Sequence, residues 1–194
     1  MLLDQQLTAC VRKLLKYGYL PKRSLKSLPP DQSSIVEDIL IEKEGKYLVK
    51  GSELHRLLLI AIEVGLSREA IISSISWKTF EEVVRLLLEI NSFNVKKHLR
   101  MRHHGKLFEI DLFATKEGRA LAVECKYWRR HFTNRIGKAV RDLNSKMEVL
   151  KSLQPPIKAE GILVLPLLHG PSYRVENIVV TDIFQLGDYL SHTY

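Results

Sequence analysis

Two carboxylates and a lysine that could do chemistry together stand close in this chain. Asp111 is followed by Glu124 and Lys126, and Glu117-Gly118 lies midway between the carboxylates. A Glu-Gly pair at the centre of a tight turn would fold this stretch into a β-hairpin, with Asp111 directly opposite Glu124. Side chains alternate along each strand, so Lys126 would share a face with Glu124, and Glu109 with Asp111. The pattern therefore predicts three acidic groups and one lysine on a single patch.

Such a patch needs something to offset its negative charge, because directly opposed like charges destabilise a strand pair. A divalent cation is one solution. The alternative is an ordinary solvated strand face, on which Glu109 pairs with Lys126 across the hairpin. The flanking residues favour the cation, since they are mostly apolar, as in the interior strands of a layered α/β domain, and an unpaired buried carboxylate is costly. These residues are Leu107, Phe108, Ile110, Leu112, Phe113, Leu121, Ala122, Val123, Tyr127 and Trp128.

The charge of the chain points to a polyanionic partner. Its formal net charge is +8 and its pI is about 9.5. Two basic stretches flank the acidic motif, and basic side chains on both sides of it could bind the phosphates of a nucleic acid. We therefore expect a nucleic acid, not a membrane. The basic stretches comprise Lys96, Lys97, His98, Arg100, Arg102, His103, His104 and Lys106; Arg129, Arg130, His131, Arg135, Lys138 and Arg141; and, near the start, Arg12, Lys13, Lys16, Lys22, Arg23 and Lys26.

Other sequence features indicate a cytoplasmic protein. The longest apolar run, Leu57 to Ile62, is too short to span a bilayer. The first four residues lack the charged region and apolar core of a signal peptide. The two cysteines, Cys10 and Cys125, both fall in apolar patterns, so we expect buried thiols and neither a disulfide nor a zinc site.

The chain is long enough for a small domain followed by a medium one. We expect the first domain over residues 1–76, with a helix over 3–17, two shorter helices, and a β-hairpin around a Glu44-Gly45 turn. Three helices followed by a hairpin resemble a winged-helix module; a packing or dimerisation domain is the alternative. The second domain, residues 77–194, is expected to begin with a helix that runs to Asn91, where Thr79 and Glu82 have the spacing of a capping box.

Along the second domain the expected order is helix, three strands, helix and strand, with a strand and a helix at the end. The first strand covers about 93–101, and the turn at 103–105 leads into the hairpin described above. A basic helix over about 134–153 has apolar residues at helical spacing, and a buried strand follows at 161–165. The fold class is therefore α/β, with an αβββαβ core.

This order, together with Phe80-Glu81 on the first helix, Glu109-Ile110-Asp111 on the second strand and Glu124-Cys125-Lys126 on the third, resembles the PD-(D/E)XK nuclease superfamily. The stretch is most similar to Mrr-type restriction endonucleases and archaeal Holliday-junction resolvases, over about residues 77–170. The resemblance implies a restriction endonuclease-like fold, a mixed sheet flanked by helices. One departure is that Ile110, not Pro, precedes Asp111.

The resemblance also implies roles for single residues. Asp111 and Glu124 would bind Mg²⁺, with Mn²⁺ as a substitute, and the backbone carbonyl of Cys125 would be a further ligand. Lys126 would position or deprotonate the attacking water and steady charge on the phosphate. Glu81 would reach in from the first helix; Glu82 is its rival, but the capping box gives Glu82 a structural role.

Backbone phosphates of DNA would be contacted by the basic side chains around the motif. For His103 and His104 a phosphate contact is favoured over metal binding, and the Cys125 thiol is expected in the core. Glu109 could bind a second metal or pair with Lys126, and the pairing is favoured. The expected nucleic-acid-binding residues are Arg100, Arg102, His103, His104, Lys106, Arg129, Arg130, Arg135 and Lys138.

The leading hypothesis is thus a Mg²⁺-dependent DNA endonuclease, related to restriction or repair, that hydrolyses phosphodiester bonds. A catalytically silent DNA-binding protein and a subunit of a nucleic-acid processing complex are the alternatives. A homodimer is expected by analogy with the resolvases and restriction enzymes. Junctions, flaps, modified duplex and RNA all stay open as substrates.

Overall fold

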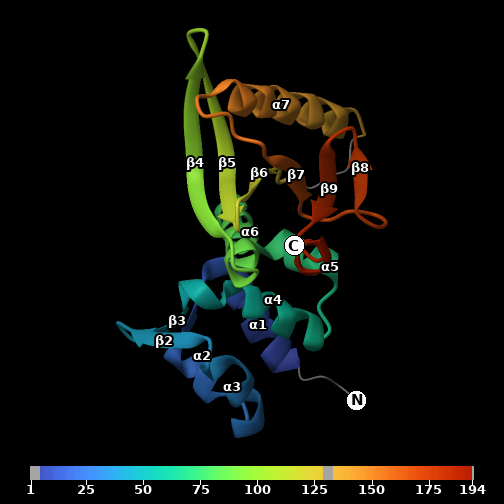
Figure 1. The fold of residues 1–194 in the computed structure, drawn as a ribbon. Coiled ribbons are helices and arrows are strands. Elements are labelled where there is room, and N and C mark those ends of the chain that lie inside the picture. Colours follow the sequence, from blue (N-terminus) through green and yellow to red (C-terminus); the bar gives the residue numbers. More distant parts are fainter. Residues whose placement is uncertain (1–4, 129–132, 194) are drawn as a thin grey trace. The chain divides into compact units, whose positions relative to one another are not determined.

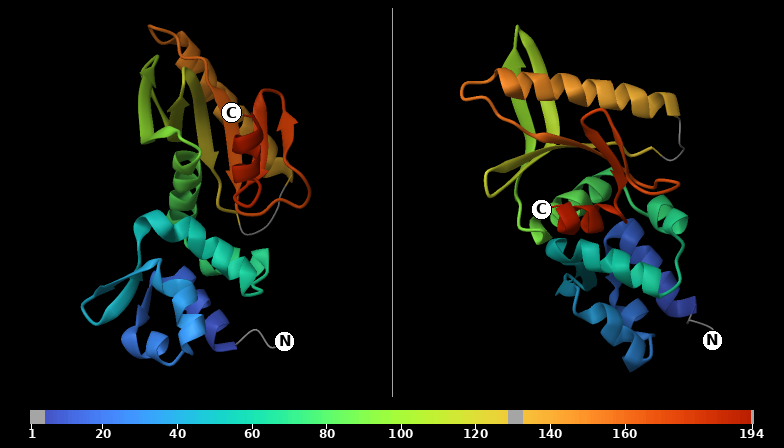
Figure 2. Two further views of the ribbon diagram at one scale, coloured as in Figure 1. Left: turned by 60° about the horizontal axis from the view of Figure 1, so that its bottom comes forward. Right: turned by 45° about the vertical axis from the view of Figure 1, so that its right-hand side comes forward.

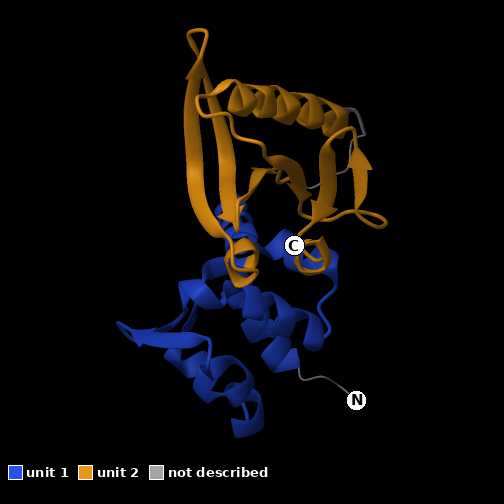
Figure 3. Ribbon diagram, in the orientation of Figure 1, with its two compact units in different colours: residues 1–86 blue, residues 87–194 orange. Residues whose placement is uncertain are grey.

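The computed structural model describes residues 5–128 and 133–193. The chain divides into two compact units, residues 1–86 and residues 87–194 (Figure 3). The division falls inside one continuous helix, α6 (Trp77–Ile90). The domain boundary expected after residue 76 lies at the beginning of this helix.

The first unit contains a small antiparallel sheet among short helices (Figure 1). Helix α1 is amphipathic and buries one stripe of side chains, which packs on α4 and α5. The expected β-hairpin is present, and Glu44 and Gly45 at its turn have φ values of 50° and 76°. The elements are α1 (Gln5–Tyr17), β1 (Tyr19–Pro21), α2 (Lys22–Lys26), α3 (Pro30–Glu37), β2 (Leu40–Lys43), β3 (Lys46–Val49), a 3₁₀ turn (Gly51–Glu53), α4 (Leu54–Glu63) and α5 (Arg68–Ser74).

Strand β1 completes this sheet and was not anticipated from the sequence. The strand order is β1-β3-β2, and Tyr19 pairs with Leu48, which in turn pairs with Ile41. A three-residue strand has too few alternating positions to stand out in a sequence. It is defined by its pairing with β3.

The second unit is an α/β domain built on a mixed six-stranded sheet. The strand order is β4-β5-β6-β7-β9-β8; β4, β5 and β6 are antiparallel neighbours, and β7 is parallel to both β6 and β9. The expected order of helix, three strands, helix and strand is confirmed. The elements after α6 are β4 (Asn94–His103), β5 (Lys106–Lys116), β6 (Arg119–Cys125), α7 (Thr133–Ser152), β7 (Glu160–Leu165), β8 (Tyr173–Val175), β9 (Ile178–Asp182) and α8 (Leu186–Thr193).

Helix α7 lies along the sheet and forms the core of this unit with it (Figure 2). Its predicted apolar stripe is buried, and these side chains pack among residues of β5, β6, β7 and β9. Gly161 on β7 allows a close approach, because a Cβ there would lie 2.1 Å from Cδ1 of Ile178. The stripe on α7 consists of Ile136, Val140, Leu143, Met147 and Leu150.

The hairpin of β5 and β6 has the register that the sequence predicts. Its turn residues Glu117 and Gly118 have φ values of 48° and 78°, as a two-residue turn of this hand requires. Lys116 pairs with Arg119, and the pairing continues to Leu112 and Val123. The next positions along this register are Asp111 and Glu124.

The expected capping box at the beginning of α6 is wrong. The helix begins at Trp77, and the hydroxyl of Ser76 accepts a hydrogen bond of 3.1 Å from the backbone N–H of Thr79. Ser76 therefore caps the helix, and Glu82 instead accepts hydrogen bonds from the guanidinium of Arg85, one turn further on.

None of the helices in the described ranges, 5–128 and 133–193, combines the length and the apolar character needed to cross a bilayer.

Candidate active site

Asp111 lies where the regular pairing of β5 with β6 ends. Its carboxylate Oδ2 accepts a hydrogen bond of 2.8 Å from the backbone N–H of Cys125, so the side chain takes the place of a backbone partner. The backbone N–H of Lys126 donates to the carbonyl of Val164 on β7 at 3.0 Å. Both strand ends are thereby fixed, and Asp111 is held half-buried beside the end of β6.

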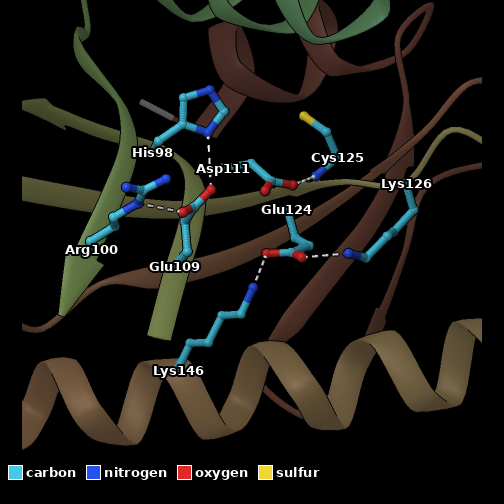
Figure 4. A network of polar contacts seen from close by, with 8 residues as sticks. All are labelled: His98, Arg100, Glu109, Asp111, Glu124, Cys125, Lys126 and Lys146. Carbon is cyan, nitrogen blue, oxygen red and sulfur yellow. Dashed lines mark hydrogen bonds and ion pairs between the residues drawn. The ribbon is translucent and has the colours of Figure 1, made fainter. Parts of the chain in front are cut away.

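Glu124 is buried, with 3% of the residue exposed, and both of its carboxylate oxygens are bound by lysines (Figure 4). Oε1 accepts a hydrogen bond of 2.5 Å from Nζ of Lys126, and Oε2 accepts one of 2.6 Å from Nζ of Lys146 on α7. A buried carboxylate with two ammonium partners avoids most of the cost of an unpaired charge. We call Asp111, Glu124, Lys126 and Lys146 the carboxylate–lysine cluster.

The four groups of this cluster act on one another electrostatically. Burial, and then the charge of Glu124, raise the pKa of Asp111 above its ordinary value, although the Cys125 N–H and the two lysines act in the opposite direction. Burial lowers the pKa of Lys126, but the hydrogen bond and charge of Glu124, with smaller contributions from other carboxylates, raise it above its ordinary value overall. Lys126 is therefore an ammonium ion at neutral pH, and Asp111 is the group that a nearby cation would most relieve.

Lys146 is the member of the cluster that sequence reasoning missed. Its side chain is 17% exposed and reaches Glu124 from a helix 22 positions further along the chain. One signal was present in the sequence, because Lys146 stands three positions after Leu143 and directly before Met147, beside the buried stripe of α7. A lysine at such a position lies near the sheet and not in open solvent.

The expected pairing of Glu109 with Lys126 is wrong. The Glu109 carboxylate accepts a hydrogen bond of 2.7 Å from Nε of Arg100 and lies 3.2 Å from Nδ1 of His98, both on β4 (Figure 4). Arg100 is directly opposite Glu109 in the β4–β5 register, and side chains at such positions are the closest partners in a sheet. These cations lower the pKa of Glu109, chiefly through the hydrogen bond from Arg100. Glu109 is thus held at the edge of the site and does not contact Lys126.

Four of the expected nucleic-acid-binding residues lie at the far end of the β4–β5 hairpin. Arg102, His104 and Lys106 are exposed there, and the turn is formed by His104 and Gly105 with φ values of 47° and 76°. His103 lies 3.2 Å from the hydroxyl of Ser152 through Nδ1. At about 3.3 Å per residue, the turn is roughly 20 Å from Asp111 along the strand. These side chains are not part of the cluster, whereas Arg100 lies beside it.

A cavity opens next to Lys126 on the side of α7. Its volume is about 340 Å³, and it is lined by Lys126, Trp128, Arg135, Lys138 and Asp142, together with Ala139. Arg135 and Lys138 are exposed, so the structure brings two of the expected phosphate contacts to the same cavity as Lys126. Arg129 and Arg130, which were also expected to bind nucleic acid, lie outside the described residues.

Glu81 and Cys125, two further candidates, are both buried. Glu81 is buried on α6 in the first unit, whereas its rival Glu82 is engaged by Arg85 at 2.6 Å. The thiol of Cys125 is buried, as is that of Cys10, so both cysteines are core residues as the sequence predicts. Figure 4 shows the Cys125 sulfur directed away from the Glu124 carboxylate.

The donor set of the cluster fits a hard divalent cation. Within residues 5–128 and 133–193, no group of three or more His, Cys, Asp and Glu side chains could hold a metal. The cluster offers two carboxylates, and Mg²⁺ commonly uses one or two carboxylates and completes its octahedral shell with water and phosphate oxygens. Burial, and then the charge of Glu124, raise the pKa of Asp111, so its ionised form is disfavoured, and a cation bound beside this carboxylate would offset that cost.

The carboxylate–lysine cluster lies at the end of the β5–β6 hairpin in a mixed-sheet α/β domain. Residues 72–154 match the model of the Mrr_cat family, described as a restriction endonuclease. The matched segment begins in the first unit and includes the whole carboxylate–lysine cluster, and it is similar to restriction endonuclease domains of the PD-(D/E)XK superfamily. No curated protein matches the chain.

Several solved structures are similar to the chain at low identity. An XisH family protein from Nostoc punctiforme has 20% identity and a TM-score of 0.37 over 44% of this chain and 68% of that chain. Can2 from Sulfobacillus thermosulfidooxidans, solved with cyclic tetra-adenylate, has 16% identity and a TM-score of 0.46 over 96% of this chain and 50% of that chain. A chain of the Thermococcus gammatolerans assembly of McrB AAA+ hexamers with bound McrC has 11% identity and a TM-score of 0.47 over 97% of this chain and 76% of that chain.

Proposed function

We propose that the chain is a Mg²⁺-dependent DNA endonuclease whose active site is the carboxylate–lysine cluster. One observation carries this proposal: Asp111, Glu124 and Lys126 interact electrostatically at the end of one hairpin, inside a segment that matches a restriction endonuclease family. A buried and a half-buried carboxylate at one place cost stability, and a function that uses them accounts for their presence.

Asp111 and Glu124 would hold the ion, with the backbone carbonyl of Cys125 as a further oxygen ligand, and Mn²⁺ would substitute for Mg²⁺. When bound, the ion supplies a Lewis acid for the scissile phosphate and lowers the pKa of a water ligand. The chain contributes the positions of these oxygens. Asp111 is oriented by the Cys125 N–H, and Glu124 by its two lysines.

Lys126 would act as a cation and hydrogen-bond donor. Because its pKa is raised, it keeps its proton at neutral pH, so it would stabilise negative charge on the phosphate and orient the attacking water instead of removing the proton from it. The cavity beside Lys126 supports this role, since Arg135 and Lys138 could bind the backbone phosphates of the same strand. Lys146 would keep Glu124 in place from α7. Glu81, the buried acid of α6, is the further candidate for the site.

A catalytically silent DNA-binding protein is the second candidate function. It is favoured by the two lysines that already bind Glu124, because a cluster whose charges balance internally does not require a metal. Cleavage assays separate the two possibilities. In a nuclease, a substitution that breaks the ion pair between Lys126 and Glu124 lowers the cleavage rate. In a silent protein, the same substitution changes only the stability of the fold.

We further propose that residues 1–76 form a winged-helix domain that presents DNA to the nuclease domain of residues 77–194. The order α1-β1-α2-α3-β2-β3 and the sheet order β1-β3-β2 support this arrangement. A homodimer and a protein partner in a repair or processing complex are expectations that follow from the family alone.

The test is incubation of the purified chain with branched, single-stranded and duplex DNA, with Mg²⁺, Mn²⁺ or EDTA. A nuclease cleaves at least one substrate with Mg²⁺ or Mn²⁺ and none in EDTA. Binding without cleavage under every condition would favour the silent protein.

A further inference from the structure

The small sheet of the first unit exposes a face that carries tyrosines and lysines. Tyr19, Leu48 and Ile41 are direct partners across β1, β3 and β2, so their side chains share one face. Leu20, the neighbour of Tyr19, points to the other face and is fully buried. Tyr19 and Ile41 are exposed although they are large and apolar. This face is therefore the outer one.

Two tyrosine rings lie side by side at the β1 edge of this face. Tyr17, at the end of α1, is 56% exposed and Tyr19 is 36% exposed, and their ring centroids are 6.2 Å apart. Nζ of Lys16 lies 5.1 Å from the Tyr17 centroid, and Nζ of Lys46 lies 4.6 Å from the Tyr19 centroid. Each ring is thus paired with a cation on a flexible stem.

The lysines on this face are not neutralised by acids within it. Lys43 and Lys46 are directly opposite each other in the β2–β3 register, an arrangement of like charges that costs stability. None of the six paired residues of this face is acidic: they are Tyr19, Pro21, Ile41, Lys43, Lys46 and Leu48. Glu42 projects to the opposite face, where it pairs with Lys22. An anion bound on the outer face would relieve the repulsion between the two lysines.

The charge of helix α3 contrasts with that of the sheet face. Helix α3 precedes the hairpin, and it contains Asp31 and Glu37 but neither lysine nor arginine. A helix of this composition repels the phosphates on both sides of a DNA groove. Within the first unit, the sheet face is therefore better suited than α3 to contact a polyanion.

We propose that this face, comprising Lys16, Tyr17, Tyr19, Lys43 and Lys46, binds a single-stranded nucleic acid. Bases stack on Tyr17 and Tyr19, and the lysines bind the phosphates between them. Exposed rings beside cations are the features of single-strand binding surfaces, and a duplex cannot use the rings because its bases already stack on one another. This proposal rests on the proposed nuclease function, because the face would recognise an unpaired strand in the substrate of that nuclease.

Binding by the full chain in EDTA tests this proposal without any cleavage. Fluorescence anisotropy is measured with labelled oligo-dT, oligo-U and a duplex of equal length. Wild type is expected to bind at least one single strand more tightly than the duplex. Whether oligo-dT or oligo-U binds more tightly shows whether the face prefers DNA or RNA. Tyr17→Ala and Tyr19→Ala are each expected to weaken that binding at least about fivefold, the smallest loss typical of a removed stacking ring. Tyr19→Phe, which keeps the ring, is expected to bind like wild type.

Tyr173→Ala is the matched control, because Tyr173 is 41% exposed and lies on β8 in the second unit. It is expected to leave binding unchanged. Lys43→Ala and Lys46→Ala are each expected to reduce the dependence of log affinity on log salt by about 0.7 for each phosphate that the variant no longer binds. Tyr17 and Tyr19 are exposed, so their alanine variants keep the far-UV circular dichroism of the wild type.

Two results would overturn the proposal: equal affinity of wild type for single strands and duplex, or unchanged single-strand affinity in the Tyr17→Ala, Tyr19→Ala double variant. The second result would indicate that the face binds a protein and not a nucleic acid. Failure of the proposed nuclease is seen elsewhere, as absence of Mg²⁺-dependent cleavage. That absence does not alter the anisotropy in EDTA.

Discussion

Nζ of Lys146 lies 2.6 Å from Oε2 of Glu124, so a lysine of helix α7 binds the buried carboxylate at the end of strand β6. The other oxygen of the same carboxylate is bound by Lys126 at 2.5 Å. The position of the helix and the geometry of the site are therefore linked through one side chain. Glu124 owes its orientation to α7 as well as to its own strand.

Removal of this link is expected to destabilise the protein. Lys146→Ala leaves Oε2 of Glu124 without its ammonium partner in a buried place, and a hydrogen bond to a charged group contributes about 1.5–3 kcal/mol. We expect a decrease of that size in the free energy of unfolding, measured by urea denaturation. Lys151→Ala is the control on the same helix, because Lys151 pairs with Glu148 on the surface, where an ion pair contributes less than about 1 kcal/mol. Equal effects of the two substitutions would contradict the link.

Asp111 is expected to make stability fall as the pH rises. Its pKa is raised in the folded state, so the folded protein binds more protons than the unfolded chain between the ordinary value of 3.8 and the raised one. The contribution of Asp111 is therefore most favourable below that window and is lost as the pH rises through it. Asp111→Asn removes this loss while an amide oxygen can still accept from the Cys125 N–H. We expect a higher melting temperature at neutral pH, by about 2–4 °C for each kcal/mol gained.

The same variant also reports on the cation. Mg²⁺ or Mn²⁺ is expected to raise the melting temperature of the wild type, because a ligand of the folded state stabilises it, and to have little effect on Asp111→Asn. Thermal unfolding with and without metal measures both. A variant less stable than the wild type at every pH, or equally stabilised by metal, would show that Asp111 is a structural acceptor only.

The turn at Gly118 is expected to need its glycine. Gly118 has φ of 78°, and an added Cβ would meet no atom within 4 Å, so the cost of Gly118→Ala is backbone strain alone, about 1–2 kcal/mol. Gly137→Ala on α7 is the matched control. Its Cβ would lie in ordinary contact, 3.6 Å from Arg141, and alanine is the better helix former by about 1 kcal/mol. Urea denaturation should therefore give opposite signs for the two substitutions; equal signs would contradict the strain.

Glu109 is expected to contribute little to cleavage. It is engaged by Arg100 and His98 at the edge of the site, and an ion pair in contact with solvent contributes little. Glu109→Gln should lower the single-turnover rate by less than about fivefold. A loss as large as that of Asp111→Asn would make Glu109 a ligand of a second metal.

The hairpin at the centre of the site could be predicted because its signals are local. Glu117-Gly118 sets the turn, and alternation from that turn determines the positions of Asp111 and Glu124. Other positions depend on partners that a local pattern does not include. Lys146 reaches Glu124 from a docked helix, and Glu109 finds Arg100 across a strand whose register depends on a second turn.

The helix start at Ser76 shows how two equivalent signals compete. Ser76 and Thr79 can both cap a helix, and Thr79 also has a glutamate, Glu82, at the third position after it, as a capping box requires. The helix that forms includes one further turn, Trp77 to Thr79, and therefore uses Ser76. Because Ser76 caps the helix, Glu82 has no capping role. The preference for Glu81 over Glu82 as a site residue therefore depends on the pairing of Glu82 with Arg85.

The most direct test of the proposed active site is the single-turnover cleavage of DNA by Lys126→Ala with Mg²⁺, with binding of the same DNA measured in parallel. Removing one group that stabilises developing charge commonly costs about 10²–10³ in rate. We predict a loss of this size in Lys126→Ala with DNA affinity unchanged, and a wild type that cleaves only when metal is present. Cleavage at the wild-type rate by Lys126→Ala, or no cleavage by the wild type with either metal, would contradict the proposed active site.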